Sequence, residues 1–177
     1  MSIGSNSNRA ARWAALFCFA GLGAAAWFAL RPPVQAPSPA VVLDVLTIET
    51  KAGPKSFKIE VANTPGQQAL GLMFRTKLDD TEGMLFPHDD TREVSMWMRN
   101  TYIPLDMVFI RADGVVHRIE ANTEPMSERI IPSNGPVGAV LEIAGGAAAR
   151  LGIATGDVVR HAQFQGTPKG TPKAGKP

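Results

Sequence analysis

Short segments in which apolar and polar residues alternate recur between residues 41 and 163. Alternation of this kind indicates β-strands with one buried face, as for Ile59 and Val61. Asp113-Gly114 separates two of these segments and predicts a tight hairpin. The pattern predicts about seven or eight short strands, at 41–50, 55–61, 84–86, 93–98, 105–111, 115–121, 137–143 and 158–164.

Two short helices are predicted between these strands. Residues 64–67 (TPGQ) combine an N-cap threonine, a proline at the first helical position and a glutamine that completes a capping box. Leu70, Met73 and Phe74 follow at helical spacing and predict one packed face, and residues 145–151 predict a second helix. Because the helices do not alternate regularly with strands, we expect an α+β fold without parallel βαβ units. The expected architecture is a single small β-rich domain with a mainly antiparallel, bent sheet or barrel.

An apolar run near the N-terminus predicts export. Residues 13–30 contain no charge, and Arg9, Arg12 and Arg31 flank them. A helix of this length spans roughly 27 Å, enough for a bilayer core. The flanking arginines place the N-terminus in the cytoplasm and the rest of the chain outside. The segment is therefore either a transmembrane anchor or a signal peptide that is cleaved.

Composition completes the division of the chain. We expect a cytoplasmic N-region at 1–12, the membrane segment at 13–30, a proline-rich linker at 31–40, a globular domain at 41–163 and a disordered basic tail at 164–177. The predicted location is extracytoplasmic, periplasmic in a bacterium, with attachment to the inner membrane through 13–30. The membrane is thus one expected partner.

Charge and cysteine usage exclude several functions. Although the sequence pI is about 8.9, residues 32–163 contain 12 basic and 16 acidic side chains, so the basic character belongs to the two ends. A mildly acidic domain does not attract phosphate backbones, and nucleic acid is not an expected partner. Cys18, within the apolar run, is the only cysteine. The exported part therefore has no disulfide, thiol nucleophile or cysteine metal site.

Several motifs occur together in order along the domain: GLMFR at 71–75, EGMLF at 82–86, WMRNTYIPLD at 97–106, VLE at 140–142 and GD at 156–157. This combination resembles the domain-of-unknown-function 192 family over nearly all of 57–160. Many members of that family have phenylalanine before the tryptophan, where this chain has Met96. The resemblance implies a small β-rich domain and export to the cell envelope. It implies no activity.

The polar side chains in 97–106 are the first candidates for a site. Arg99 offers a planar pair of donors for a carboxylate or phosphate, and Asp106 is an acceptor. Asn100 and Thr101 are residues that bond nearby main chain in turns. One interpretation is that these groups support a bend in the backbone. The other is that Arg99, Asn100, Thr101 and Asp106 line a pocket beside Trp97.

Arg75 and Glu142 are the remaining candidates. Strand alternation places Glu142 with Val140 on the face opposite Leu141 and Ile143. A carboxylate on a partly apolar face needs a partner, which Arg75 or Arg99 would supply. A structural ion pair and a catalytic acid both remain open for this glutamate.

The sequence favours a binding domain in the cell envelope. We expect a small polar or anionic ligand, or a partner protein, at Trp97, Arg99, Asn100, Thr101, Asp106, Arg75 and Glu142. One alternative is a glycan hydrolase with Asp106 and Glu142 as its carboxylates. Another is a Cu(I) carrier that uses the thioethers of Met96 and Met98, with help from His88. No catalytic residue, resident metal or cofactor is indicated.

Overall fold

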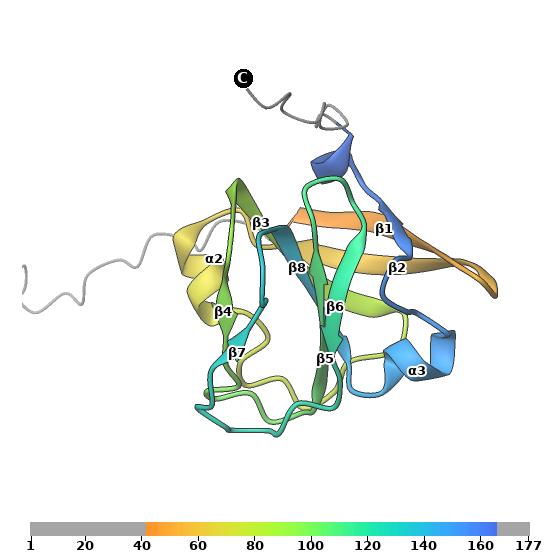
Figure 1. Ribbon diagram of the computed structural model, residues 1–177. Coiled ribbons are helices and arrows are strands. Elements are labelled where there is room, and N and C mark those ends of the chain that lie inside the picture. The colour runs from red at the N-terminus through yellow and green to blue at the C-terminus, as the bar shows by residue number, and fades with distance from the viewer. Residues whose placement is uncertain (1–41, 166–177) are drawn as a thin grey trace, which may run out of the picture. The chain divides into compact units, whose positions relative to one another are not determined.

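A computed structural model describes residues 42–165, which form a small β-rich domain with two short α-helices (Figure 1). Seven strands form one curled sheet in the order β6-β5-β8-β3-β2-β1-β9, and β4 pairs with β7 separately. The strands are β1 Val42–Thr50, β2 Gly53–Val61, β3 Glu82–Arg92, β4 Ser95–Met96, β5 Leu105–Ile110, β6 Val116–Glu120, β7 Ile131–Pro132, β8 Val137–Ala144 and β9 Val158–Arg160. The helices are α2 Pro65–Leu70 and α3 Ala147–Leu151, and a 3₁₀ turn, η1 Ala162–Phe164, follows β9.

The large sheet is mixed, so the expectation of a mainly antiparallel sheet is only partly right. Strands β2 and β3 run parallel, from the pair Lys58–Glu82 to the pair Val61–Leu85. Parallel neighbours need a crossover connection, and α2 with the loop after it provides one. The exclusion of a βαβ unit was therefore wrong at this one connection.

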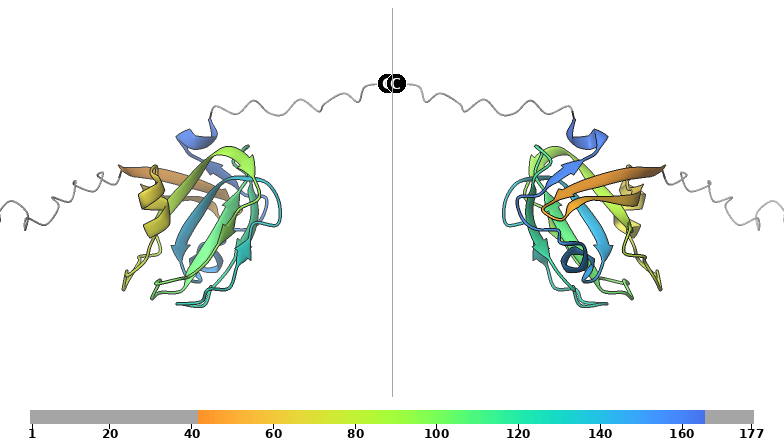
Figure 2. Two further views of the ribbon diagram at one scale, coloured as in Figure 1. Left: turned by 90° about the vertical axis from the view of Figure 1, so that its left-hand side faces the viewer. Right: turned by 90° about the vertical axis from the view of Figure 1, so that its right-hand side faces the viewer.

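The sheet curls into a half-barrel, which Figure 2 shows from two sides. The curl brings the β5–β6 hairpin to β9, where Val115 and Val158 form an isolated antiparallel bridge. Val159 N–H donates to the carbonyl of Gly114 at 2.8 Å, and Val116 N–H donates to that of Asp157 at 2.9 Å. Gly114 has φ +82° in the turn that makes this approach, a conformation that glycine adopts without strain.

Two hydrophobic clusters pack against opposite faces of the sheet. The first includes buried residues from seven strands, so it lies on the face that curls inward: Leu46, Phe57, Leu85, Val108, Val116, Leu141 and Val159. The second lies on the other face of β3, β8 and β5 beneath the loops: Leu72, Met84, Phe86, Met98, Met107, Phe109, Ile131 and Val140. The candidate site borders this second cluster.

The start of α2 confirms the predicted capping box. Thr64 Oγ1 accepts from Gln67 N–H at 3.2 Å, and the Gln67 side chain accepts from Thr64 N–H at 3.0 Å. The helix ends at Leu70, earlier than expected, and buries none of its residues. The packed face predicted from Leu70, Met73 and Phe74 is therefore wrong: Leu70 and Phe74 are exposed, because Gly71, with φ +49°, ends the helix and turns the chain away.

Other boundaries also differ from expectation. Strand β3 continues past Phe86 to Arg92, whereas β4 contains only two of the residues expected at 93–98. Strand β9 is shorter than predicted and passes into η1. Within residues 42–165 no helix is long and apolar enough to cross a membrane. The predicted anchor at 13–30 lies outside these residues.

Candidate functional site

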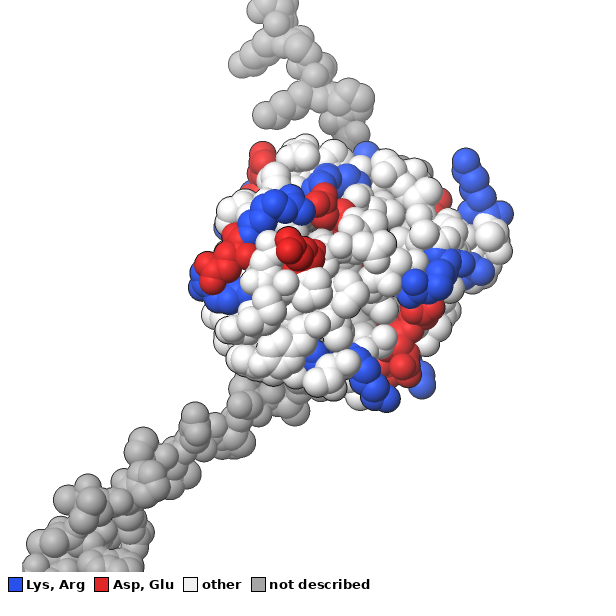
Figure 3. All heavy atoms as spheres, turned by 90° about the horizontal axis from the view of Figure 1, so that it is seen from below, with Lys and Arg blue, Asp and Glu red and all other residues white. Residues whose placement is uncertain are grey.

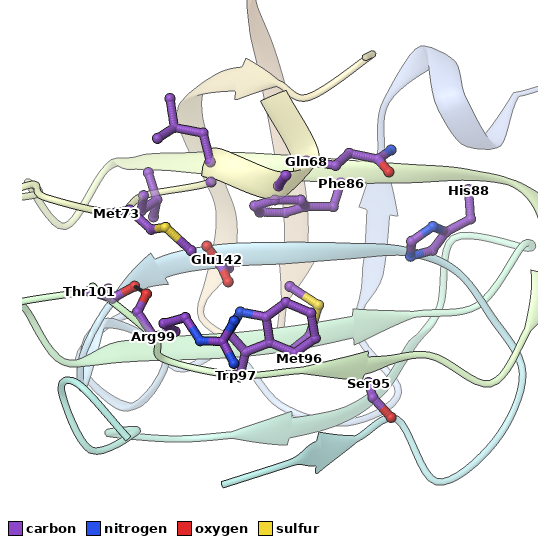
Figure 4. A pocket seen from close by; sticks show the side chains of 14 residues that line it. Gln68, Met73, Phe86, His88, Ser95, Met96, Trp97, Arg99, Thr101 and Glu142 are labelled. Carbon is purple, nitrogen blue, oxygen red and sulfur yellow. Dashed lines mark hydrogen bonds between the residues drawn. The ribbon is translucent and has the colours of Figure 1, made fainter. Parts of the chain in front are cut away.

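A pocket of about 180 Å³ opens between α2, the end of β3 and the loop after β4 (Figure 4). Since water occupies about 30 Å³ per molecule in the liquid, this is room for about six waters. The walls are mostly apolar and the polar groups are few, as is usual for small-molecule sites. The lining residues are Gln68, Ala69, Leu70, Gly71, Leu72, Met73, Phe86, His88, Ser95, Met96, Trp97, Arg99, Thr101 and Glu142.

Glu142 supplies the buried carboxyl group of this pocket. It lies in the middle of β8, where Met84 of β3 and Met107 of β5 are its cross-strand neighbours. Its face was correctly predicted, because Leu141 and Ile143 belong to the core cluster on the other side. Only 5% of the residue is exposed, and its carboxyl has no hydrogen-bond or ion-pair partner among residues 42–165. Desolvation raises the pKa of Glu142 from 4.5 to about 8.

Glu142 is the central member of a row of three glutamates. The strand register aligns Glu60, Met84, Glu142, Met107 and Glu120 across five strands, and residues paired in this way share a face. The two outer glutamates have arginine partners. Arg75 Nη2 is 2.6 Å from Glu60 Oε2, and Arg129 Nη2 is 2.7 Å from Glu120 Oε1, with Arg118 on the same carboxylate. The hydrogen bond from Arg129 and the charges of Arg118 and Arg129 lower the pKa of Glu120. The central carboxyl is the one left without a cation among the described residues.

Trp97 and Arg99 form one wall of the pocket at its mouth. Trp97 is 45% exposed, and the guanidinium carbon of Arg99 is 5.7 Å from the centre of the Trp97 ring. Arg99 Nε also donates to Glu128 Oε1 at 3.1 Å. Figure 4 shows the Glu142 carboxyl near the middle of the pocket, on the side toward Trp97 and Arg99. The predicted ion pair between Arg99 and Glu142 is therefore not formed, because the Arg99 guanidinium pairs with Glu128 instead.

Two residues in the left-handed conformation directly follow residues that line the pocket, Phe74 after Met73 and Asn100 after Arg99. Asn100 has φ +55° and Phe74 has φ +64°, and Phe74 N–H donates to the Asn100 carbonyl at 2.9 Å. A bulky aromatic at positive φ is uncommon, and such conformations collect at ligand clamps and other functional sites. The Phe74 and Tyr102 rings meet edge to face with centroids 6.0 Å apart, and both side chains are at least half exposed. The main-chain bond between Phe74 and Asn100 thus joins the two segments that carry the lining residues Met73 and Arg99.

Asn100 and Thr101 mainly support this corner. Asn100 does not line the pocket, and its amide is 3.9 Å from the sulfur of Met73. Thr101 lines the pocket but is buried, and its hydroxyl donates to the Arg99 carbonyl at 3.3 Å. The Thr101 carbonyl accepts from Met126 N–H at 3.0 Å, which fixes the neighbouring loop. Of the two interpretations of this stretch, a braced bend is the one that describes Asn100.

Asp106 is not part of the pocket, contrary to expectation. It is paired in register with Ile143, so it lies on the opposite face of the sheet from Glu142. The residue is fully buried, and main-chain N–H groups take up both of its oxygens. Oδ1 accepts from Asn122 and Gly146 at 2.8 Å each, and Oδ2 accepts from Ala148 at 2.9 Å. Asp106 therefore anchors the start of α3, and the hydrolase pair of Asp106 with Glu142 is wrong.

Arg75 is likewise placed elsewhere. It pairs with Glu60 and lines a second hollow, of about 400 Å³, with Leu43, Val45 and Lys58. Arg75 and Glu60 pair with each other, so neither charged group needs a ligand as its partner. Arg75 is not a partner of Glu142.

His88 belongs to the pocket but was predicted only as an assistant in copper binding. It extends from β3 beyond the point where that strand was expected to end. Its Nε2 atom is buried without a hydrogen-bond partner among the described residues. Burial, with a smaller effect of the Arg92 charge, lowers the pKa of His88 from 6.5. The pocket thus holds a second polar group that is neutral at pH 7.

The methionines do not form the predicted copper pair. Met96 lines the pocket, whereas Met98 is buried in the core, where its sulfur accepts from the Thr123 hydroxyl at 3.1 Å. They do not share a strand, because β4 ends at Met96. Met73 is the second thioether that lines the pocket. Among residues 42–165 no group of three histidine, cysteine, aspartate or glutamate side chains is arranged to hold a metal.

Comparison with known proteins identifies relatives of the domain. The DUF192 family profile, described as an uncharacterised ACR family, matches residues 46–161. A solved protein of unknown function from Novosphingobium aromaticivorans DSM 12444 is 44% identical, with a TM-score of 0.68 over 75% of this chain and 94% of its own. A second, from Sinorhizobium meliloti 1021 and described as a candidate transcription regulator, is 40% identical, with a TM-score of 0.68 over 71% of this chain and 98% of its own. No curated protein matches the chain.

Proposed function

Because the chain belongs to the uncharacterised DUF192 family, we propose its function from its own pocket: it is a binding domain that takes a small polar ligand beside Trp97. The observation that carries this proposal is the Glu142 carboxyl, which has no partner among residues 42–165 and belongs to a residue that is only 5% exposed. Because Glu142 lines the pocket, this carboxyl can hydrogen-bond or pair with a ligand without first giving up a protein partner among the described residues.

The size of the pocket limits the ligand. Sites for drug-sized molecules usually measure about 300–1,000 Å³, and this one measures about 180 Å³. A ligand of a few heavy atoms, or the polar end of a longer one, is the expected occupant. The exposed ring of Trp97, which lines the pocket, would cover the part that protrudes.

We further propose that binding takes place outside the cytoplasm. The apolar segment 13–30 and its flanking arginines support export. A role in transcription regulation that requires DNA binding is less well supported, although the Sinorhizobium protein is described as a candidate transcription regulator. On the face shown in Figure 3, lysine and arginine lie among aspartate and glutamate around an uncharged area and form no broad basic patch.

Binding is tested by titrating the full-length chain with a library of small polar molecules and following the Trp97 indole N–H and the Met73 and Met96 methyl groups by NMR. The proposal predicts saturable shifts at these three side chains. Glu120→Gln is a matched control, because it changes a glutamate of the same row that lies outside the pocket, and it should leave the shifts unchanged. Binding that does not perturb Trp97 or either methionine would contradict the proposal.

Export is tested separately. In a Cys18→Ala background, Gly170→Cys introduces a single thiol in the C-terminal tail. A maleimide that cannot cross the inner membrane should label this thiol in intact cells whose outer membrane has been made permeable. Labelling only after lysis would place the domain in the cytoplasm and refute this part of the proposal.

A further inference from the structure

The charge missing from the row of glutamates indicates what kind of ligand the pocket takes. Glu60 and Glu120 each lie against at least one arginine, whereas Glu142 has methionine on both neighbouring strands and no cation among the described residues. A buried carboxylate is stabilised by a paired positive charge, and without one the group takes up a proton. Beside Glu60 and Glu120 the place next to the carboxylate is filled by an arginine, whereas the same place beside Glu142 is open to a cation from a ligand.

The walls of the pocket suit a cation as well. The exposed face of Trp97 and the ring of Phe86 offer the negative side of an aromatic system. The thioethers of Met73 and Met96 offer polarisable surface for an alkyl group. Figure 4 shows Trp97 on one side of the Glu142 carboxyl and Met73 and Phe86 on the other.

The other ionisable groups of the pocket do not fill the place. Arg99, from the loop after β4, donates a hydrogen bond to Glu128 and lies over the Trp97 ring. His88, from β3, is a neutral imidazole because burial lowers its pKa. Strand β5 and helix α2 contribute no charged side chain: Met107 faces Glu142 from β5, and the polar lining residue of α2 is Gln68. Gln68 is bound to the carbonyls of Ala62 and Pro87.

From this arrangement we propose that the ligand is a small amine, whose protonated nitrogen pairs with the Glu142 carboxylate while its apolar body lies between Trp97, Phe86 and the two methionines. The inference rests on the proposed binding function and specifies its ligand class. The amine enters as the ammonium ion and no covalent bond forms. Below about pH 8, Glu142 releases its proton to solvent as the ammonium group binds.

This proton release gives the proposal a distinctive pH dependence. Each bound amine displaces up to one proton, so affinity should rise up to about tenfold per pH unit between pH 6 and 8. It should level off above pH 8, where Glu142 is already ionised and the amine is still protonated. A neutral ligand that needs the carboxylic acid, or an anion, would show the opposite slope.

The test titrates the full-length chain with butylamine, butanol and butyrate, which share one alkyl chain and differ in charge. The Trp97 indole N–H and the Met73 and Met96 methyl shifts are followed from pH 6 to pH 9. Butylamine should bind tightest, with the rising pH profile. Glu142→Gln, which keeps the shape of the side chain and removes its charge, should weaken butylamine binding by at least about tenfold and leave butanol unchanged. Glu120→Gln should behave as wild type.

Three kinds of binding result would overturn the inference, and so would the absence of binding. They are preferential binding of butanol or butyrate, an affinity for butylamine that falls with pH, and butylamine binding that Glu142→Gln retains. In the first two cases the pocket remains a ligand site and only the ligand class is wrong. No perturbation of the pocket by any of the three probes would overturn the amine proposal, whereas the wider library decides whether the binding function also fails.

Discussion

Asp106 and Glu142 lie on the adjacent strands β5 and β8 with their carboxyl groups on opposite faces of the sheet. Three main-chain N–H groups satisfy Asp106, whereas Glu142 has no partner among residues 42–165. Both residues are buried. The difference in their surroundings assigns a structural role to the first and leaves the second open to a ligand.

Glu142 should make the free energy of unfolding depend on pH. Its pKa is raised to about 8 in the folded domain, against 4.5 when unfolded. The folded state therefore binds the proton more tightly, and stability contributed by the acid form is complete below pH 4.5 and is lost as pH rises to 8. Glu142→Gln should remove this loss and exceed wild-type stability above pH 8, measured by urea unfolding from pH 5 to 9. Parallel pH profiles for the two proteins would contradict the assignment.

Asp106→Asn should destabilise the domain by about 3 kcal/mol, because an amide N–H₂ would replace one acceptor and face a main-chain donor. The change should loosen the start of α3, where Gly146 and Ala148 N–H groups bond the carboxylate. Chemical unfolding gives the loss, and hydrogen exchange of Ala148 N–H locates it. Wild-type stability in this variant would mean that the three bonds contribute little.

The capping box at Thr64, the hairpin at Asp113-Gly114 and the face of Glu142 were all predictable, because they depend on residues close together in sequence. The environment of Asp106 was not, since its donors in Asn122, Gly146 and Ala148 come from other elements. The partner of Arg99 could not be predicted for the same reason, because Glu128 is 29 residues away in the sequence.

His88 was not predicted to line the site beside Trp97, and the reason is more local. Pro87 reads as the end of a strand, because proline cannot donate to the ladder. In the structure β3 passes through Pro87, and the register with β8 shifts between Pro87 and Arg92.

The parallel pairing of β2 with β3 could not be read from the sequence either, because alternation indicates strands and not their direction.

Two substitutions at Asn100 distinguish a role in the backbone conformation from a role in ligand binding. At φ +55°, alanine should cost about 1 kcal/mol relative to glycine. Asn100→Ala should therefore unfold more easily than Asn100→Gly, while both variants lose the same amide. Equal stability of the two would show that the left-handed corner carries no strain.

Arg99→Ala should lower the free energy of unfolding by less than about 1 kcal/mol, because its ion pair with Glu128 is exposed. Thermal unfolding with the double variant Arg99→Ala, Glu128→Ala measures the coupling. A loss several times larger would make Arg99 a structural residue.

His88 should destabilise the domain as pH falls. Burial lowers its pKa from 6.5, so the stability of the neutral form is present above pH 6.5 and is lost as pH falls through the folded value. His88→Phe should abolish this acid-side loss and, by removing an unpartnered buried nitrogen, raise stability at pH 7 by about 1 kcal/mol. Urea unfolding between pH 5 and 7 provides the comparison, and a destabilised phenylalanine variant would indicate that the nitrogen has a partner.

The state of the Glu142 carboxyl underlies both the binding function and the amine inference. It is measured directly by following the ¹³C shift of this side-chain carboxyl against pH in the ligand-free protein, with Glu142→Gln to assign the signal. The structure predicts a midpoint near pH 8. A midpoint near 4.5, the ordinary value of glutamate, would show that the group is already solvated or paired and would contradict the account.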